Sequence, residues 1–242
     1  MKVLILAGGY GTRLAAVVKD TPKPLIPVND RPLIDYSVDK VKGIAGLTEI
    51  VVVTNNKFHG HFLKWAELCP TIRIVNDGTN TNEERLGSVG DMHFVWQKEK
   101  TPDDWLIIGG DNLFDQDLNA FMDFARAHQP AVSIGLYDIH DIKAATKFGV
   151  CAIDSQAHVT SFQEKPEQPA SSLITMCVYY FPRQTLGDIE QYRKESKTLD
   201  AAGSYIKWLA EKNNVYGFNF KGKWYDIGSV ESLNEARAHF AS

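Results

Sequence analysis

The order of apolar runs and helical patterns along the 242 residues predicts a Rossmann-like α/β/α fold of three layers. In the first half of the chain, apolar runs of strand length alternate with helical patterns, which is typical of a parallel, doubly wound sheet. In the second half, strand-like runs follow one another through shorter connections, which indicates mixed or antiparallel pairing. We therefore expect a mainly parallel, mixed central sheet with helices on both of its faces.

The elements of the first half follow from apolar content and spacing. Lys2–Leu6 and Glu49–Val53 are nearly continuous apolar runs, as expected of strands buried on both faces. Pro32 suits the first turn of a helix. We expect strands at Lys2–Leu6, Glu49–Val53, Ile72–Val75 and Trp105–Ile108, and helices at about Pro32–Lys42, Phe58–Leu68, Leu86–Lys98 and Leu118–His128.

The second half is richer in strand-like runs. We expect strands at Ala131–Tyr137, Gly149–Ile153, Val159–Phe162, Thr175–Phe181, Val215–Phe220 and Trp224–Ile227, and helices near Leu199–Glu211 and Val230–Phe240. The sequence has no linker, low-complexity segment or internal repeat. We predict one domain over residues 1–242.

Composition excludes several classes of function. The net charge is −4 and the basic residues are scattered, so we expect neither a nucleic-acid surface nor a membrane surface. The 3 cysteines show no CxxC spacing, which is typical of a reduced, cytoplasmic protein without structural zinc. The opening apolar run is too short for a signal peptide, and no run reaches membrane-spanning length.

A glycine-dense turn follows the first strand. The run Leu6-Ala7-Gly8-Gly9-Tyr10-Gly11-Thr12-Arg13-Leu14 is followed, after a short interval, by Pro22-Lys23-Pro24. Glycines let backbone N–H groups approach a ligand, so this turn is suited to hold phosphate groups. Arg13 and Lys23 would supply the side-chain positive charge that a polyanion needs.

Other interpretations of this glycine loop fit the residues less well. A P-loop requires Lys-Ser/Thr after its last glycine, and a dinucleotide fingerprint requires a third glycine and an acid after the second strand. Neither requirement is met. Thr12-Arg13 follows Gly11, the third glycine is missing, and Val53-Thr54-Asn55 carries no acid at the end of the second expected strand. A turn without a ligand would leave the two cations unexplained.

Two aspartates are candidate metal ligands. Asp111 follows the apolar run Trp105–Ile108, at the strand end where ligands collect in α/β folds, and Asp226 lies in Trp224-Tyr225-Asp226-Ile227-Gly228. Joining two phosphate-bearing substrates requires charge neutralisation, and carboxylates suit a hard divalent cation. Each aspartate alone could equally cap a turn.

Taken together, these motifs resemble those of the sugar-1-phosphate nucleotidyltransferases, the family of NDP-sugar pyrophosphorylases that includes glucose-1-phosphate thymidylyl- and uridylyltransferases. The resemblance implies that the glycine loop binds the nucleotide and that Asp111 and Asp226 bind Mg²⁺. It also implies catalytic roles for Arg13, Lys23 and Lys165. The implied nucleotide-binding residues are Leu6, Ala7, Gly8, Gly9, Gly11, Thr12, Arg13, Lys23, Gly87 and Asp111.

The second half carries the motifs of the acceptor. Glu164-Lys165-Pro166 resembles the E-K-P of the family, whose glutamate holds sugar hydroxyls and whose lysine holds the sugar phosphate. Phe148-Gly149-Val150 resembles its Y/F-G-V. The implied substrate-binding residues are therefore Gly149, Glu164, Lys165 and Cys177, although Cys177 replaces a glycine of the family.

The base-binding motif also departs from the family. Leu86-Gly87-Ser88-Val89-Gly90-Asp91 resembles L-G-T-A-G-A, which reads the base through backbone groups, but Val89 and Asp91 replace small residues.

From these motifs we expect Mg²⁺-dependent transfer of a nucleotidyl group from an NTP, with a pyrimidine base favoured, to a sugar 1-phosphate. Within the single domain, we expect about residues 1–130 to bind the NTP and about residues 131–242 to bind the sugar phosphate. Two alternatives stay open. One is a CTP-dependent enzyme that acts on a phosphoalcohol, and the other is a catalytically silent, sugar-nucleotide-binding regulatory subunit. A homodimer is left open.

Overall fold

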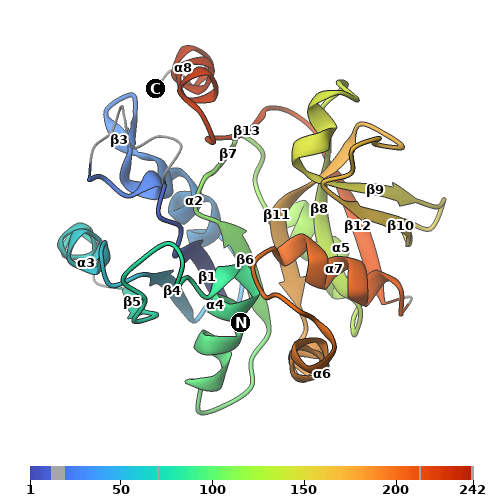
Figure 1. The fold of residues 1–242 in the computed structure, drawn as a ribbon, viewed down its shortest axis with the longest axis horizontal. Coiled ribbons are helices and arrows are strands. Elements are labelled where there is room, and N and C mark those ends of the chain that lie inside the picture. Colours follow the sequence, from blue (N-terminus) through green and yellow to red (C-terminus); the bar gives the residue numbers. More distant parts are fainter. Residues whose placement is uncertain (12–19, 70, 213, 241–242) are drawn as a thin grey trace.

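The computed structural model describes residues 1–11, 20–69, 71–212 and 214–240. In these ranges nine strands form one mixed sheet, whose main path runs in the order β10-β9-β11-β6-β1-β4-β5, while β8 pairs with β11 and β12 (Figure 1). The strands are β1 (Lys2–Ala7), β4 (Glu49–Thr54), β5 (Ile72–Asn76), β6 (Trp105–Gly109), β8 (Val132–Asp138), β9 (Gly149–Ile153), β10 (Val159–Glu164), β11 (Leu173–Phe181) and β12 (Val215–Phe220).

The pairing changes direction between the two halves of the sheet. Strand β1 pairs in parallel with β4 and β6, and β4 pairs in parallel with β5. Strand β11 then runs antiparallel to β6, β8 and β9, as β10 does to β9, while β12 pairs in parallel with β8. The prediction of a mainly parallel first half and mixed second half is confirmed.

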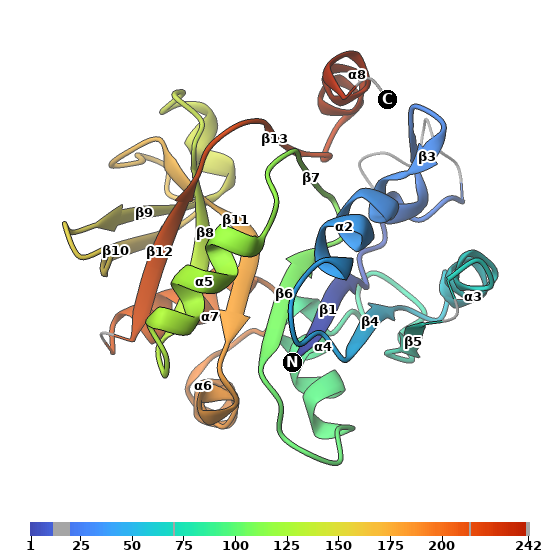
Figure 2. The ribbon, with the colours of Figure 1, turned by 180° about the vertical axis from the view of Figure 1, so that it is seen from behind.

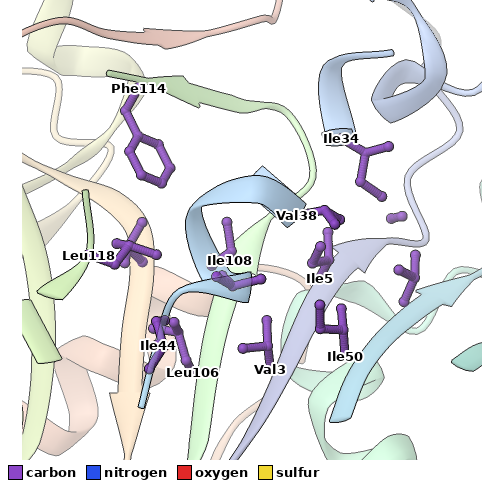
Figure 3. Close-up of a cluster of buried hydrophobic side chains, with 14 of the residues drawn as sticks. Val3, Ile5, Ile34, Val38, Ile44, Ile50, Leu106, Ile108, Phe114 and Leu118 are labelled. Atoms are coloured by element: carbon purple, nitrogen blue, oxygen red, sulfur yellow. The ribbon is translucent and has the colours of Figure 1, made fainter. Parts of the chain in front are cut away.

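Helices cover both faces of this sheet, as predicted for three layers. One face carries α2 (Leu33–Lys42), α3 (His59–Ala66) and α5 (Asn119–Ala127), and the other carries α4 (Gly87–Gln97), α6 (Asp188–Glu195) and α7 (Ala202–Ala210) (Figures 1 and 2). Alternate residues of the strands fill the two cores. In β1, Val3 and Ile5 point toward α2, as Figure 3 shows, while Leu4 joins the opposite cluster.

A third, smaller core lies above the carboxyl ends of the parallel strands. Here β7 (Asn112–Phe114) pairs with β13 (Trp224–Asp226), and the short pair β2 (Pro27–Val28) and β3 (Arg31–Pro32) lies nearby. Helix α8 (Val230–His239) covers them and begins at a Ser229–Ser232 capping box. Three short 3-10 helices, η1 (Lys23–Leu25), η2 (Ala144–Lys147) and η3 (Arg183–Thr185), lie in connections among the described residues.

Sequence patterns located most elements to within a few residues but missed α6, β7 and the β2–β3 pair. Helix α6 buries only Ile189 and Tyr192, so its apolar stripe is too short to be recognised in the sequence. Across the described ranges, no helix combines the length and the apolar character needed to cross a membrane.

Candidate active site

A cavity of about 690 Å³ opens where β1 and β6 end. These neighbouring parallel strands connect onward in opposite directions along the sheet, β1 toward β4 and β6 toward β11. This reversal is the point where open α/β sheets bind ligands, because the connecting loops diverge there. Residues from both halves of the chain line the cavity, so one site can receive two substrates.

The described residues that the sequence singled out all line this cavity. They are Leu6, Ala7, Gly8, Gly9, Gly11, Lys23, Gly87, Asp111, Gly149, Glu164, Lys165, Cys177 and Asp226. Thr12 and Arg13 lie outside the described residues.

The glycine loop is held in place by neighbouring backbone and by one buried amide. The N–H of Gly110 donates to the carbonyl of Leu6 at 2.9 Å, which joins the loop to the end of β6. Asn55 is fully buried, donates from Nδ2 to the carbonyl of Gly8 at 2.9 Å and accepts from the N–H of Phe58 at 3.0 Å. Asn55 therefore anchors the loop, in the place where a dinucleotide-binding protein would carry an acid.

Lys23 and the two predicted metal-binding aspartates lie together. The Lys23 ammonium lies 2.7 Å from Oδ2 of Asp111 and 3.9 Å from Oδ1 of Asp226. The two aspartates lie close together because Asp226 of β13 pairs with Asn112 of β7, and Asn112 directly follows Asp111 in the chain. Burial acts to raise the pKa of Asp111, but the adjacent Lys23 ammonium outweighs it and the pKa lies below its usual value.

This pair of carboxylates fits a Mg²⁺ ion that also binds substrate phosphates. Their arrangement around the Lys23 ammonium shows that they already face a cation. In the part of the chain that the structure describes, no group of three or more His, Cys, Asp or Glu side chains could hold a metal alone. Mg²⁺ commonly takes one or two carboxylates and completes its shell with phosphates and water, so a pair suffices.

The residues of the predicted acceptor motifs line the cavity from the second half of the chain. Glu164 ends β10, and its Oε1 is 3.9 Å from the Lys165 ammonium. Burial raises the pKa of Glu164, and Lys165 only partly offsets this rise. The first turn of α7 packs against this carboxylate: a Cβ on Gly203 would lie 1.8 Å from Oε2 of Glu164. A side chain at position 203 would therefore force the Glu164 carboxylate to move.

Cys177 lies at a break in the pairing of β11. The register with β8 shifts between Thr175 and Tyr179, and Cys177 has a φ of 54°, in the left-handed region. The predicted departure from a family glycine therefore falls at a position where the backbone favours glycine. Burial, with a smaller effect of the Asp111 charge, raises the pKa of the Cys177 thiol to about 12, so it is a poor nucleophile.

Residues 199–201 were predicted to be part of a helix, whereas the structure has them directly before α7, where Asp200 and Ala201 line the cavity. The carbonyls of Leu199 and Asp200 accept from the first N–H groups of α4, and Asp200 forms a bidentate ion pair with Arg85 at 3.0 and 2.8 Å. Gly87, with a φ of 76°, leaves no room for a side chain beside Asp200. Only Gly203, a poor helix former inside a helical pattern, could have drawn attention to this segment.

Trp224 and Asn112 are further cavity residues that the sequence did not single out. The indole N–H of Trp224 donates to Oδ1 of Asn112 at 2.6 Å, and its ring contacts Phe148, with 5.5 Å between centroids. Trp224 thus links the strand that carries Asp226 to the Gly149 motif.

Two solved structures are similar to this one over nearly the whole chain. One is described as a glucose-1-phosphate thymidylyltransferase from Bacillus anthracis in complex with sucrose; it has a TM-score of 0.84 and 24% identity, and the match covers 98% of this chain and 94% of that one. The other is a UDP-glucose pyrophosphorylase complexed with UDP-glucose, with a TM-score of 0.81, 20% identity and coverage of 99% and 97%. At these identities the likeness shows a shared fold.

The family model of the nucleotidyl transferases matches residues 2–242. This match confirms the resemblance found in the sequence motifs. The chain therefore belongs to the nucleotidyl transferase family and is a nucleotidyltransferase.

Proposed function

We propose that this protein transfers a nucleotidyl group from a nucleoside triphosphate to a sugar 1-phosphate in a Mg²⁺-dependent reaction that yields an NDP-sugar and pyrophosphate. The observation that carries the proposal is the composition of the cavity. Lys23, Asp111 and Asp226 line it beside the glycine loop, and Glu164 and Lys165 line it from the second half of the sheet. One wall suits a triphosphate, and the other suits a phosphate that carries hydroxyl groups.

In this reaction an oxygen of the sugar phosphate attacks the α-phosphorus of the triphosphate. A new P–O bond forms while the bond from the α-phosphorus to the bridging oxygen breaks, and pyrophosphate leaves with that electron pair. The attacking oxygen is already ionised at neutral pH, so no strong general base is required. Catalysis then consists of aligning the two phosphates and neutralising their charge.

The proposed roles follow from charge and position. Lys23 stabilises charge on the triphosphate, Lys165 orients the sugar phosphate, and the Glu164 carboxylate accepts hydrogen bonds from sugar hydroxyls. Arg13 would hold the leaving pyrophosphate. Mg²⁺, held by Asp111 and Asp226 when bound, would supply further charge neutralisation between the substrates.

We further propose that the triphosphate carries a pyrimidine base. Both similar structures have names that refer to pyrimidine nucleotides, a thymidylyltransferase and a UDP-glucose pyrophosphorylase. Their low identity to this chain makes the base a matter for direct measurement.

The test is a pyrophosphate-release screen of UTP, dTTP, CTP, GTP and ATP against a panel of sugar 1-phosphates, with and without Mg²⁺. We expect release with a pyrimidine triphosphate and at least one sugar 1-phosphate, and loss of release with EDTA. Phosphocholine tests the phosphoalcohol alternative, in which Cys177 would replace a sugar contact. No release with any pair would favour a silent binding subunit, and release without Mg²⁺ would contradict the proposed metal requirement.

A further inference from the structure

The Glu164 carboxylate packs against two glycines that are far apart in the sequence. Gly149 lies opposite Glu164 in the β9–β10 pair, and Gly203 is the second residue of α7. A Cβ on Gly203 would lie 1.8 Å from Oε2 of Glu164, and a Cβ on Gly149 would lie 3.2 Å from the same oxygen. The carboxylate can therefore occupy this place only because position 203 has no side chain.

The two glycines differ in what a side chain would meet. The three heavy atoms nearest to a Cβ at position 203 all belong to the Glu164 carboxyl group, at 1.8, 2.7 and 3.3 Å. A Cβ at position 149 would also lie 2.7 Å from the ring of Phe162 and 2.9 Å from the hydroxyl of Thr175. A side chain at position 149 would therefore disturb several neighbours, whereas one at position 203 would meet the Glu164 carboxylate first.

The helical structure of α7 does not itself require a glycine at position 203. The residue lies in the first turn of the helix, with a backbone conformation that any residue can adopt. Alanine is the better helix former at such a position. The glycine thus weakens the helix slightly, and the space that it leaves is taken by the Glu164 carboxylate.

This carboxylate faces the cavity, which Glu164, Gly149 and Gly203 all line. The Glu164 side chain is 20% exposed, and its Oε1 lies 3.9 Å from the Lys165 ammonium, which is longer than a hydrogen bond. Within the described ranges, no residue donates a hydrogen bond to the carboxylate. Packing therefore holds the group in place, and its capacity to accept hydrogen bonds is left for a ligand.

We propose that Gly203 is a positioning residue for the acceptor, because it keeps the Glu164 carboxylate where it accepts hydrogen bonds from the hydroxyl groups of the sugar 1-phosphate. The inference rests on the proposed function for the identity of the ligand. A side chain at position 203 would displace the far end of a flexible side chain, so the fold is kept. The loss then falls on recognition of the hydroxyl groups, while the phosphate group is still bound at Lys165.

The test separates the hydroxyl groups of the acceptor from its phosphate group. Isothermal titration calorimetry in the presence of Mg²⁺ gives Kd for the 1-phosphates of glucose, galactose and mannose and for inorganic phosphate, which carries no sugar hydroxyls. We expect the wild-type protein to bind at least one sugar 1-phosphate more tightly than inorganic phosphate. Gly203→Ala should lower this preference on the order of tenfold and leave Kd for inorganic phosphate within about twofold.

A double-mutant cycle shows whether Gly203 acts through Glu164. Glu164→Ala removes the group that a Cβ at position 203 would displace, so in that background Gly203→Ala should change the preference by less than about twofold. A purely structural role of the glycine in α7 would give the same loss in both backgrounds. In urea, the double variant should be at least as stable as Glu164→Ala alone, because alanine favours the helix.

Gly60→Ala is the matched control. Gly60 is the second residue of α3, as Gly203 is of α7, but a Cβ there would meet no other part of the protein within 4 Å, and the residue lies outside the cavity. This substitution should leave the affinities for the sugar 1-phosphates and for inorganic phosphate unchanged.

If Gly203→Ala does not fold alone, Glu164→Asp provides the background. Its carboxylate is one methylene shorter and is withdrawn from position 203, so Glu164→Asp should itself lower the preference on the order of tenfold. Adding Gly203→Ala should then change the preference by less than about twofold.

The inference is overturned if Gly203→Ala keeps the wild-type preference, if it causes the same loss in the Glu164→Ala background, or if the wild-type protein binds no sugar 1-phosphate better than inorganic phosphate. A protein that shows the expected pattern yet releases no pyrophosphate would contradict the proposed function and leave this inference standing. Pyrophosphate release together with an unchanged preference in Gly203→Ala would overturn this inference alone.

Discussion

The two walls of the cavity differ in how completely the protein satisfies its own charges. On the triphosphate wall, the residues proposed to bind the triphosphate (Gly8, Gly11, Lys23, Asp111 and Asp226), the Lys23 side chain is 15% exposed and lies 2.7 Å from a carboxylate. On the acceptor wall, the residues proposed to bind the sugar phosphate (Gly149, Glu164, Lys165 and Cys177), the Lys165 side chain is 62% exposed and lies 3.9 Å from its partner. The ammonium group of the first wall is paired with a carboxylate and shielded from solvent, whereas the lysine of the second wall is mostly exposed to solvent.

The topology of the sheet explains this difference. The triphosphate wall is built where parallel strands end side by side, which brings backbone amides and strand-end acids together. The acceptor wall is built on antiparallel strands, where Cys177 and Lys165 have φ values of 54° and 44°. We therefore expect substitutions on the first wall to impair catalysis and substitutions on the second wall to impair acceptor binding.

Lys23→Ala should have the largest effect. Removing the ammonium leaves Asp111 and Asp226 facing each other and removes charge stabilisation from the triphosphate, so we expect kcat to fall by about 100- to 1,000-fold. Steady-state kinetics of pyrophosphate release would measure it. Lys98→Ala is the matched control, because Lys98 lies over the ring of Phe94 and outside the cavity. A kcat close to wild type in Lys23→Ala would contradict a role of this ammonium group in catalysis.

Glu164→Gln should have an intermediate effect. The substitution replaces one carboxylate oxygen, an acceptor of sugar hydroxyls, by an NH₂ donor and removes the charge, so KM for the sugar 1-phosphate should rise on the order of tenfold, with KM for the triphosphate unchanged. If both KM values rise equally, the two walls are not functionally separate.

Glu164→Gln also tests the raised pKa of the Glu164 carboxyl group. The pKa of Glu164 is raised in the folded protein, so its contribution to stability is fully present below the ordinary glutamate pKa of about 4.3 and is lost as pH rises through the folded value. Glu164→Gln should remove this loss. Urea unfolding from pH 4 to pH 8 should show a weaker decline in the variant, and an identical decline would contradict the raised pKa.

Cys177→Gly should have the smallest effect. Glycine relieves the left-handed backbone, but it also gains entropy in the unfolded chain and loses the contacts of the half-buried side chain, so we expect a change in unfolding free energy below about 1 kcal/mol. Cys177→Val should cost about 1–3 kcal/mol, because a β-branched side chain is strained at positive φ. Equal stability of the two variants in urea would show that this backbone is not constrained.

The sequence predicted the fold where each element has its own apolar pattern. Lys2–Ala7 and Glu49–Thr54 are strands that could be located by their continuous apolar residues. The strand pair β7–β13 could not be located fully, because Asn112–Phe114 is short and its pairing spans more than a hundred residues.

The residues of the candidate site were likewise only partly predictable from the sequence. Residues carried by motifs, such as Lys23 and Glu164, could be proposed from the sequence, and the structure places them in the cavity. Asn55 and Asp200 could not, because each acts on a segment remote in sequence through an ordinary-looking polar side chain or carbonyl.

The segment from Leu199 to Gly203 has a consequence for how the substrates influence each other. Its first carbonyls hold the opening turn of α4, and its last residue packs against Glu164. A single stretch of backbone therefore contacts both the start of α4, which borders the cavity at Gly87, and the Glu164 carboxylate. Any shift of this stretch when one substrate binds must alter the surface offered to the other, so the two binding affinities should be thermodynamically linked, each changing the other by the same factor.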